Sequence, residues 1–189
     1  FLFTAGAAAG WGAFETDRRL AFGGFAATAT SKSDTDYATG WLQAAYLADQ
    51  GHWYLKPLIE ARVTELDFSG AREAGGGGLG LVVSGSRDTM LSVSPALEVG
   101  TEFRFDALAV WRPFVRAGVT WRDEDAFVTQ AAFAGATLGV PGFQIVTDVD
   151  DVLFDISAGV DVIGGDGAVL KVQYDGRFGS TLSQNSVSL

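Results

Sequence analysis

The sequence predicts an all-β fold, an antiparallel up-and-down β-barrel that crosses a membrane with its strands. Three observations lead to this prediction. Apolar and polar residues alternate with a period of two along six segments, the charges of each segment keep almost entirely to one parity, and several segments run for 11 to 15 residues. Strands of soluble proteins are typically about 5–6 residues long, whereas a tilted strand that crosses a bilayer needs about 9–11. Long alternating runs are therefore typical of a transmembrane barrel.

Composition supports this fold class and excludes others. Nearly half of the 189 residues are hydrophobic, yet no stretch of eighteen apolar residues lacks a charged or polar break, which argues against a membrane-spanning helix. There are 25 Gly and 14 Phe, and the absence of Cys excludes a disulfide framework. A net charge of −10 disfavours nucleic-acid binding, because phosphate recognition needs a basic surface.

The six alternating segments are the strongest strand predictions. Their ranges are Thr35–Asp49, Trp53–Leu66, Met90–Phe105, Leu108–Arg122, Asp151–Val162 and Ala168–Phe178. A helix would spread their charges around a period of 3.6 residues, but here the main exception to a single parity is Glu65, near a strand end.

Weaker signals complete a count of about ten strands. Less regular strands are predicted at Phe3–Phe14, Leu20–Thr30 and Gly78–Val83, and a last one begins near Asn185. Turn residues separate the strands at Ser31–Thr35, Asp49–His52, Ser84–Asp88, Gly164–Gly167 and Gly179–Gln184. The segment Asp123–Asp150 is predicted to be one long loop with room for a short hairpin.

The distribution of charge favours a membrane barrel over a soluble one. One face of the strands is nearly free of charge and carries aromatic residues at its ends, as a lipid-facing band would. The predicted lipid-facing residues are Trp53, Ile59, Leu97, Trp111, Val115, Ile156 and Leu170. The opposite face mixes Glu and Arg with small polar residues, which suits an aqueous lumen. The predicted lumen-facing residues are Lys56, Glu60, Arg62, Glu98, Glu102, Arg112, Arg116, Asp155, Asp161, Lys171 and Asp175.

No catalytic, cofactor or metal site is predicted, and we do not expect an enzyme. His52, the only histidine, lies at a predicted turn without local partners, and no Gly-x-Ser-x-Gly elbow is present. The run Gly75–Gly78 lacks the Lys-Ser/Thr ending of a phosphate loop. Asp148, Asp150 and Asp151 resemble half of a calcium loop, but the required Gly and closing Glu are missing.

Four stretches of the sequence resemble the translocator β-domain of autotransporters, the type V secretion proteins. They are "GHWYLKP" at Gly51–Pro57, "PALEVG" at Pro95–Gly100, "AFAGA" within Asp125–Pro141, and "YDGRFG" at Tyr174–Gly179, which is followed by "SVSL". The resemblance implies a twelve-stranded barrel in the bacterial outer membrane, with a helix in its lumen and a passenger N-terminal to it. It also implies outer-membrane lipid, the passenger linker and the barrel-assembly machinery as partners. The chain ends at Leu189 without the family's terminal aromatic residue.

The resemblance leads to one prediction and two alternatives. Residues 1–189 are predicted to form a single translocator domain, truncated at both ends, that anchors and exports a passenger. Glu98 is the residue we expect to contact the passenger linker. One alternative is an outer-membrane porin or structural barrel without a passenger. The other is a soluble β-barrel that binds an apolar ligand, and the uncharged strand face argues against it.

Overall fold

The structure is a computed structural model, which describes residues 1–106, 109–137, 139–165 and 167–189. The predicted all-β fold is confirmed. Ten strands of the described chain form one antiparallel sheet, in which eight follow one another in the order β1-β2-β4-β7-β9-β12-β13-β14. Their bounds are β1 Leu2–Phe22, β2 Phe25–Ala45, β4 Trp53–Phe68, β7 Ser86–Thr101, β9 Ala109–Arg122, β12 Val152–Gly164, β13 Val169–Phe178 and β14 Ser183–Ser188.

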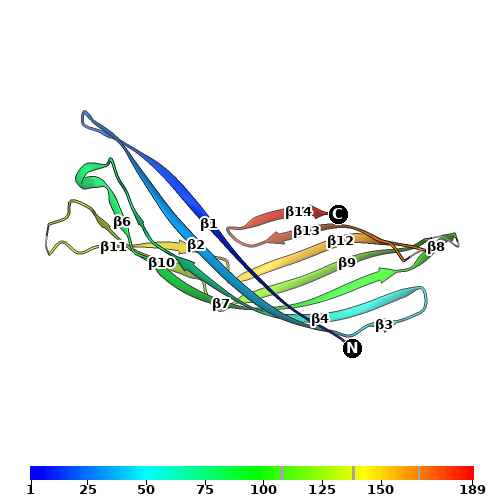
Figure 1. Cartoon of the computed structure of the whole chain (residues 1–189). Helices are drawn as coiled ribbons and strands as arrows, with labels where there is room; N and C mark the ends of the chain where they lie inside the picture. Colours follow the sequence, from blue (N-terminus) through cyan, green and yellow to red (C-terminus); the bar gives the residue numbers. More distant parts are fainter. Residues whose placement is uncertain (107–108, 138, 166) are drawn as a thin grey trace.

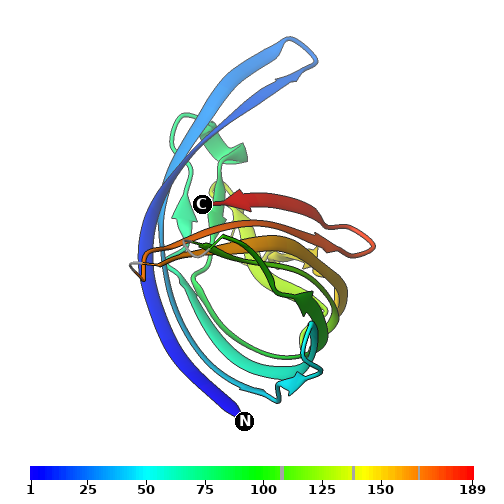
Figure 2. The same cartoon turned by 90° about the vertical axis from the view of Figure 1, so that its right-hand side faces the viewer.

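The large sheet is curled. Figure 2 shows its strands curving around a central space, with β1 and β14 at its two edges. The short strands β3 (Ala48–Asp49) and β8 (Phe103–Asp106) pair with β4 and β9. The connections between consecutive long strands are all short at one end of the sheet, whereas the other end carries the two longest, between β4 and β7 and between β9 and β12. No helix in the described parts of the chain is long and apolar enough to cross a membrane.

The long connections fold into a second, smaller sheet beyond one end of the large one (Figure 1). This cap sheet has the order β11-β10-β6-β5, formed by β5 (Ala71–Arg72), β6 (Leu81–Val83), β10 (Ala126–Phe133) and β11 (Phe143–Asp148). A 3₁₀ turn, η1 (Gly77–Leu79), precedes β6. The hairpin predicted within Asp123–Asp150 is thus present as β10 and β11. The strand predicted at Gly78–Val83 is shorter than expected and belongs to the cap sheet.

The hairpin of β1 and β2 corrects another part of the prediction. Ser31–Thr35 was expected to be a turn, but these residues lie inside β2, paired with β1. The chain reverses instead at Gly23 and Gly24, whose φ angles of 52° and 85° favour glycine. Phe22 and Phe25 stack beside this turn at 5.2 Å. The polar residues that signalled a turn occupy a strand that continues past the apolar part of the sheet.

Side chains of the large sheet alternate between two faces. We call the concave one the inner face and the convex one the outer face. The predicted parities are preserved in β4, β7, β9, β12 and β13, and the register aligns them across the strands. The predicted start of one segment, Leu108, lies outside the described residues.

Candidate functional site: the charged inner face

Polar side chains of six neighbouring strands form one continuous row across the inner face. Because each residue of the row is the direct cross-strand partner of the next, all their side chains point to the same side of the sheet. The row consists of Lys56, Glu98, Arg116, Ser157, Asp175 and Ser186. A parallel row on the outer face is largely apolar and consists of Leu55, Val99, Val115, Ala158, Tyr174 and Val187.

Glu98 is the centre of the charged row. Its side chain is buried, with 4% of the residue exposed. Oε1 accepts hydrogen bonds from the Tyr54 hydroxyl at 3.0 Å and from Lys56 Nζ at 3.1 Å. Oε2 accepts from Arg116 Nε at 2.9 Å and Nη2 at 2.5 Å. Two cations therefore compensate one buried carboxylate, which is the arrangement that a buried charge requires.

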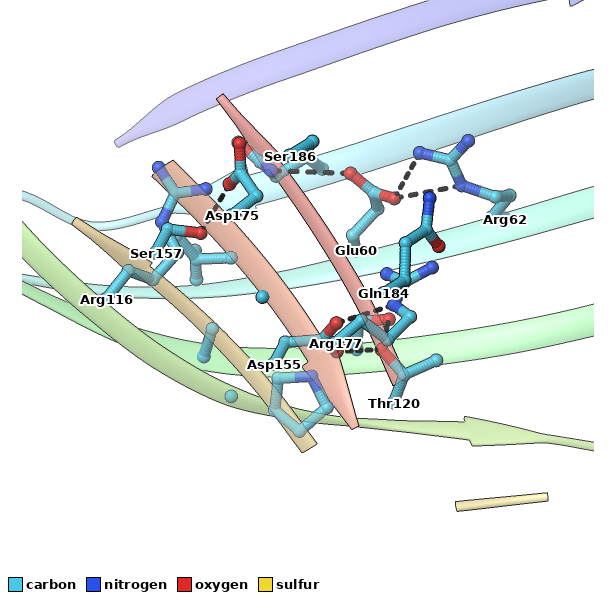
Figure 3. A pocket seen from close by; sticks show the side chains of 17 residues that line it. Glu60, Arg62, Arg116, Thr120, Asp155, Ser157, Asp175, Arg177, Gln184 and Ser186 are labelled. Atoms are coloured by element: carbon cyan, nitrogen blue, oxygen red, sulfur yellow. Dashed lines mark hydrogen bonds and ion pairs between the residues drawn. The ribbon is translucent and has the colours of Figure 1, made fainter. Parts of the chain in front are cut away.

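A second ionic cluster lies toward the cap end of the inner face. Asp155 accepts hydrogen bonds from Arg177 Nε at 2.7 Å and from the Thr120 hydroxyl at 2.5 Å (Figure 3). Thr120 in turn is 2.7 Å from the Ser94 hydroxyl. Asp175 accepts from the Ser157 hydroxyl at 2.6 Å. These contacts connect β7, β9, β12 and β13 through side chains as well as through the backbone.

Glu60 and Arg62 form a third cluster on β4. Arg62 donates to Glu60 Oε1 from Nη2 at 2.8 Å and from Nε at 3.1 Å. Its guanidinium also lies 5.1 Å from the centroid of the Trp41 ring, within the range of a cation–π contact. Trp41 fits beside β1 because its neighbour there is Gly6, where a Cβ atom would lie 2.1 Å from the ring.

The clusters surround a polar cavity of about 350 Å³. Residues of β2, β4, β7, β9, β12, β13 and β14 line it (Figure 3). A second hollow of about 290 Å³ lies toward the end with the short turns. It is lined by Tyr54, Lys56, Glu98, Glu102, Arg112 and Asp161, together with the residues around His52. The first cavity is lined mainly by polar and charged side chains, whereas the lining of the second also includes Leu2, Leu47 and Trp53.

The acidic side chains of the inner face and His52 are the groups that bear on metal binding and catalysis. In the described ranges, no three His, Cys, Asp or Glu side chains are placed to hold a metal ion. His52 lines the second hollow. In the described residues its imidazole forms no hydrogen bond or ion pair, and only its backbone groups are bonded, the carbonyl accepting from the Thr101 hydroxyl. The charged clusters of the inner face can form hydrogen bonds and ion pairs with water or with a polar ligand.

Asp150 has a structural role in place of the weak cation site that was considered for it. Its carboxylate accepts hydrogen bonds from the backbone N–H groups of Ser180, Thr181 and Leu182 and from the Ser180 hydroxyl. These bonds, the hydroxyl of Ser180 first, lower the pKa of Asp150 to about 2. The carboxylate thereby fixes the turn between β13 and β14 to the start of β12.

The structure places the predicted site residues on the two faces as the parity required. All eleven residues predicted to face a lumen lie on the inner face. The seven predicted to face lipid lie on the outer face, and six of them are exposed, among them Val115 at 54% and Leu170 at 53%. Ile156 is half-buried. Contact of these faces with lipid and with water stays a prediction.

Sequence reasoning missed the aromatic residues of the inner face. Tyr54 and Trp41 lie there among the charges, each opposite a glycine of the neighbouring strand, Gly100 and Gly6. A glycine opposite each aromatic residue would have indicated that the ring lies on the inner face. These pairs can be recognised only once the register between the strands is known. Arg177 and Thr120, which hold Asp155, were likewise not selected.

The fold and the two-faced sheet define a class of protein, the antiparallel β-barrels with a polar interior. Comparison with known families is more specific. Residues 1–175 match the family model described as Autotransporter beta-domain, so the chain belongs to this family.

Two further comparisons were made. Among solved structures, the chain is similar to the β-domain of the Bordetella autotransporter BrkA, at 12% identity and a TM-score of 0.40. The alignment covers 97% of this chain and 87% of that one. A search of curated proteins found no match.

Proposed function

We propose that this chain is the translocator part of an autotransporter, which is held in the bacterial outer membrane and carries an N-terminal passenger to the cell surface. Membership of the family supports this proposal. The observation that carries it is the separation of charge: the inner face bears ion-pair clusters, whereas the outer face over the same rows bears exposed apolar side chains. A soluble protein rarely exposes a contiguous apolar surface of this kind.

The height of the apolar band fits a membrane. On β9 the outer face runs from Trp111 to Trp121, ten residues apart, with only apolar side chains between them. At about 3.4 Å per residue and a tilt of about 40°, this corresponds to a height of about 25 Å, the thickness of the apolar band of outer-membrane barrels. Tryptophan at both ends matches the aromatic girdles of such barrels.

The outer face becomes charged beyond the band. Glu65 and Asp67 follow Val63 on β4, and both contact Arg87 of β7, at 3.4 and 2.9 Å. Glu65 thus breaks the parity rule because β4 extends past the lipid into water. Since the long connections and the cap sheet lie at this end, we place this end outside the cell, as is usual for long loops of such barrels.

A matched pair of substitutions tests the membrane assignment. Val115 on the outer face of β9 and Val146 on β11 of the cap sheet are almost equally exposed, at 54% and 55%. We expect Val115→Arg to impair insertion, since arginine near the bilayer midplane costs about 2–4 kcal/mol. Val146→Arg should have little effect. The measurement is the yield of the complete protein in outer-membrane fractions and its mobility shift on unboiled gels. Equal tolerance of both substitutions, or recovery in the soluble periplasm, contradicts the assignment.

Protease treatment of intact cells tests the export role separately. Digestion of a segment N-terminal to Phe1 at the cell surface is the expected result. If the protein inserts but no upstream segment reaches the surface, the alternative of a porin or structural barrel is favoured.

A further inference from the structure

Basic residues are concentrated on the inner face of this acidic protein. The sequence has 13 Lys and Arg against 23 Asp and Glu. Between the rows of Val110 and Arg122, however, eight basic and seven acidic side chains of the described strands and of Glu102, which directly follows β7, lie on the inner face. The basic ones are Lys56, Arg62, Arg104, Arg112, Arg116, Arg122, Lys171 and Arg177. The acidic ones are Asp49, Glu60, Glu98, Glu102, Asp155, Asp161 and Asp175.

Most of the inner carboxylates are already engaged. Glu98 pairs with both Lys56 and Arg116, and Glu102 pairs with both Arg104 and Arg112. Glu60 and Asp155 each pair with one arginine, and Asp175 accepts from Ser157 and Gln173. Among the described residues, Lys171 and Arg122 are the inner-face cations that form no ion pair.

The two unmatched cations lie near opposite ends of the inner face. Lys171 of β13 is the cross-strand partner of Asp161 in β12, and Asp161 is in turn the partner of Arg112 in β9. Arg112 and Arg122 are ten residues apart along β9. The Lys171 ammonium lies 5.3 Å from the Phe114 ring centroid. Arg122 donates to the backbone carbonyl of Asp150 at 3.5 Å, and the carboxylates of Asp150 and Asp155 attract it from beyond ion-pair distance. Asp161, the cross-strand neighbour of Lys171, leaves Oδ1 without a hydrogen bond instead of pairing with the lysine.

We propose that the polypeptide segment that occupies this lumen is acidic and places a carboxylate against Lys171 and another near Arg122. This inference rests on the proposed function and specifies the chemistry of the partner. Arg112, the residue of β9 in the same row as Lys171, and Arg122 are about 25 Å apart along the barrel axis, by the same geometry as the apolar band. That distance corresponds to about 17 residues of α-helix or about 8 residues of extended chain.

The three lysines of the sequence allow a direct test in the complete protein within native outer membranes. A water-soluble carbodiimide joins a lysine Nζ to a carboxylate in contact with it, forming an amide while the reagent takes up the lost water as a urea. Mass spectrometry then identifies the linked peptides. Lys56 and Glu98, whose atoms are 3.1 Å apart, form the internal control inside the lumen. Lys32 and Glu15 form the control on the exposed hairpin.

The expected result is an amide between Lys171 and an Asp or Glu that precedes Phe1, which Lys171→Gln abolishes. Formation of the Lys56–Glu98 amide shows that the reagent has reached the lumen. If Lys171 in the same sample is not coupled, or is coupled only to Asp161, the proposal is overturned. A second measurement is the passenger exposed on cells. Lys171→Glu should reduce it several-fold, whereas Lys32→Glu should not, and equal effects also overturn the proposal. Loss of outer-membrane location would instead refute the proposed function, so the two failures are distinguishable.

Discussion

Replacing Glu98 by glutamine leaves Lys56 and Arg116 on the inner face without their common carboxylate. Removing one partner of a fully buried ion pair costs about 3–5 kcal/mol, whereas exposed pairs contribute about 0–1 kcal/mol. The side chains of Lys56 and Arg116 are 22% and 27% exposed, so water compensates part of the loss. We therefore expect Glu98→Gln to lower the free energy of unfolding by about 2 kcal/mol, or about 30-fold in the equilibrium constant.

The assay is a urea titration of the complete protein folded in detergent micelles, followed by tryptophan fluorescence. Glu65→Gln is the matched control, because Glu65 and Arg87 are 46% and 65% exposed in their side chains. The control should change stability by less than about 1 kcal/mol. The double variant Glu98→Gln with Arg116→Gln should lose less than the sum of the single variants, since the two residues interact directly. A cost for Glu98→Gln no larger than that of the control refutes the reasoning.

Three further predictions concern packing and the cap end. Gly100→Val should destabilise the fold by about 1–3 kcal/mol in the same titration, because a Cβ atom at residue 100 lies 2.4 Å from the Tyr54 ring. Gly12→Val is the control and should cost less, since a Cβ atom at residue 12 meets open space. Equal losses of stability for the two variants would contradict this reasoning. Asp150→Asn should speed proteolysis of the turn after β13 at neutral pH. Since the folded pKa of about 2 is below the usual value, the wild-type advantage is present from about pH 4 upward and is lost as the pH falls through 2; a pH-independent difference would contradict the assignment. Finally, the hydrogen bond from Arg18 keeps the pKa of Glu73 below its usual range. Glu73→Gln should therefore speed cleavage of the loop before β6 several-fold in a timed digestion, and an unchanged rate would show that this contact does not hold the loop.

The faces of the strands were predictable because a period of two needs only local sequence. Charge parity assigned residues such as Arg116 and Val115 to opposite faces without any knowledge of neighbouring strands. The tip of the first hairpin was not predictable by the same means. Ser, Thr and Asp at 31–35 signal a turn in a short strand, but they also occur in a strand that continues into water. The Gly23–Gly24 dipeptide at the true turn is also a hairpin signal, but it was passed over in favour of the longer polar run that follows it.

Which charges meet could not be predicted, because contacts between strands depend on register. Lys56, Glu98 and Arg116 lie on three strands, and nothing in the separate segments aligns them. The cap sheet was missed for a similar reason, since β6 and β10 are far apart in the sequence and pair only after both long connections fold together.

The same clusters explain why this register is preferred. A slip of one residue between β7 and β9 would move every side chain of one strand to the other face, and would place Glu98 or Arg116 among apolar side chains. A slip of two residues keeps the faces but sets Glu98 opposite Phe114 or Gly118, the present partners of Gly100 and Ala96. Either slip leaves a buried carboxylate without its arginine, which is costly. Where β7 and β9 pair, the outer face is apolar and therefore insensitive to slips of two residues, so the inner ion pairs are what distinguish the native alignment there.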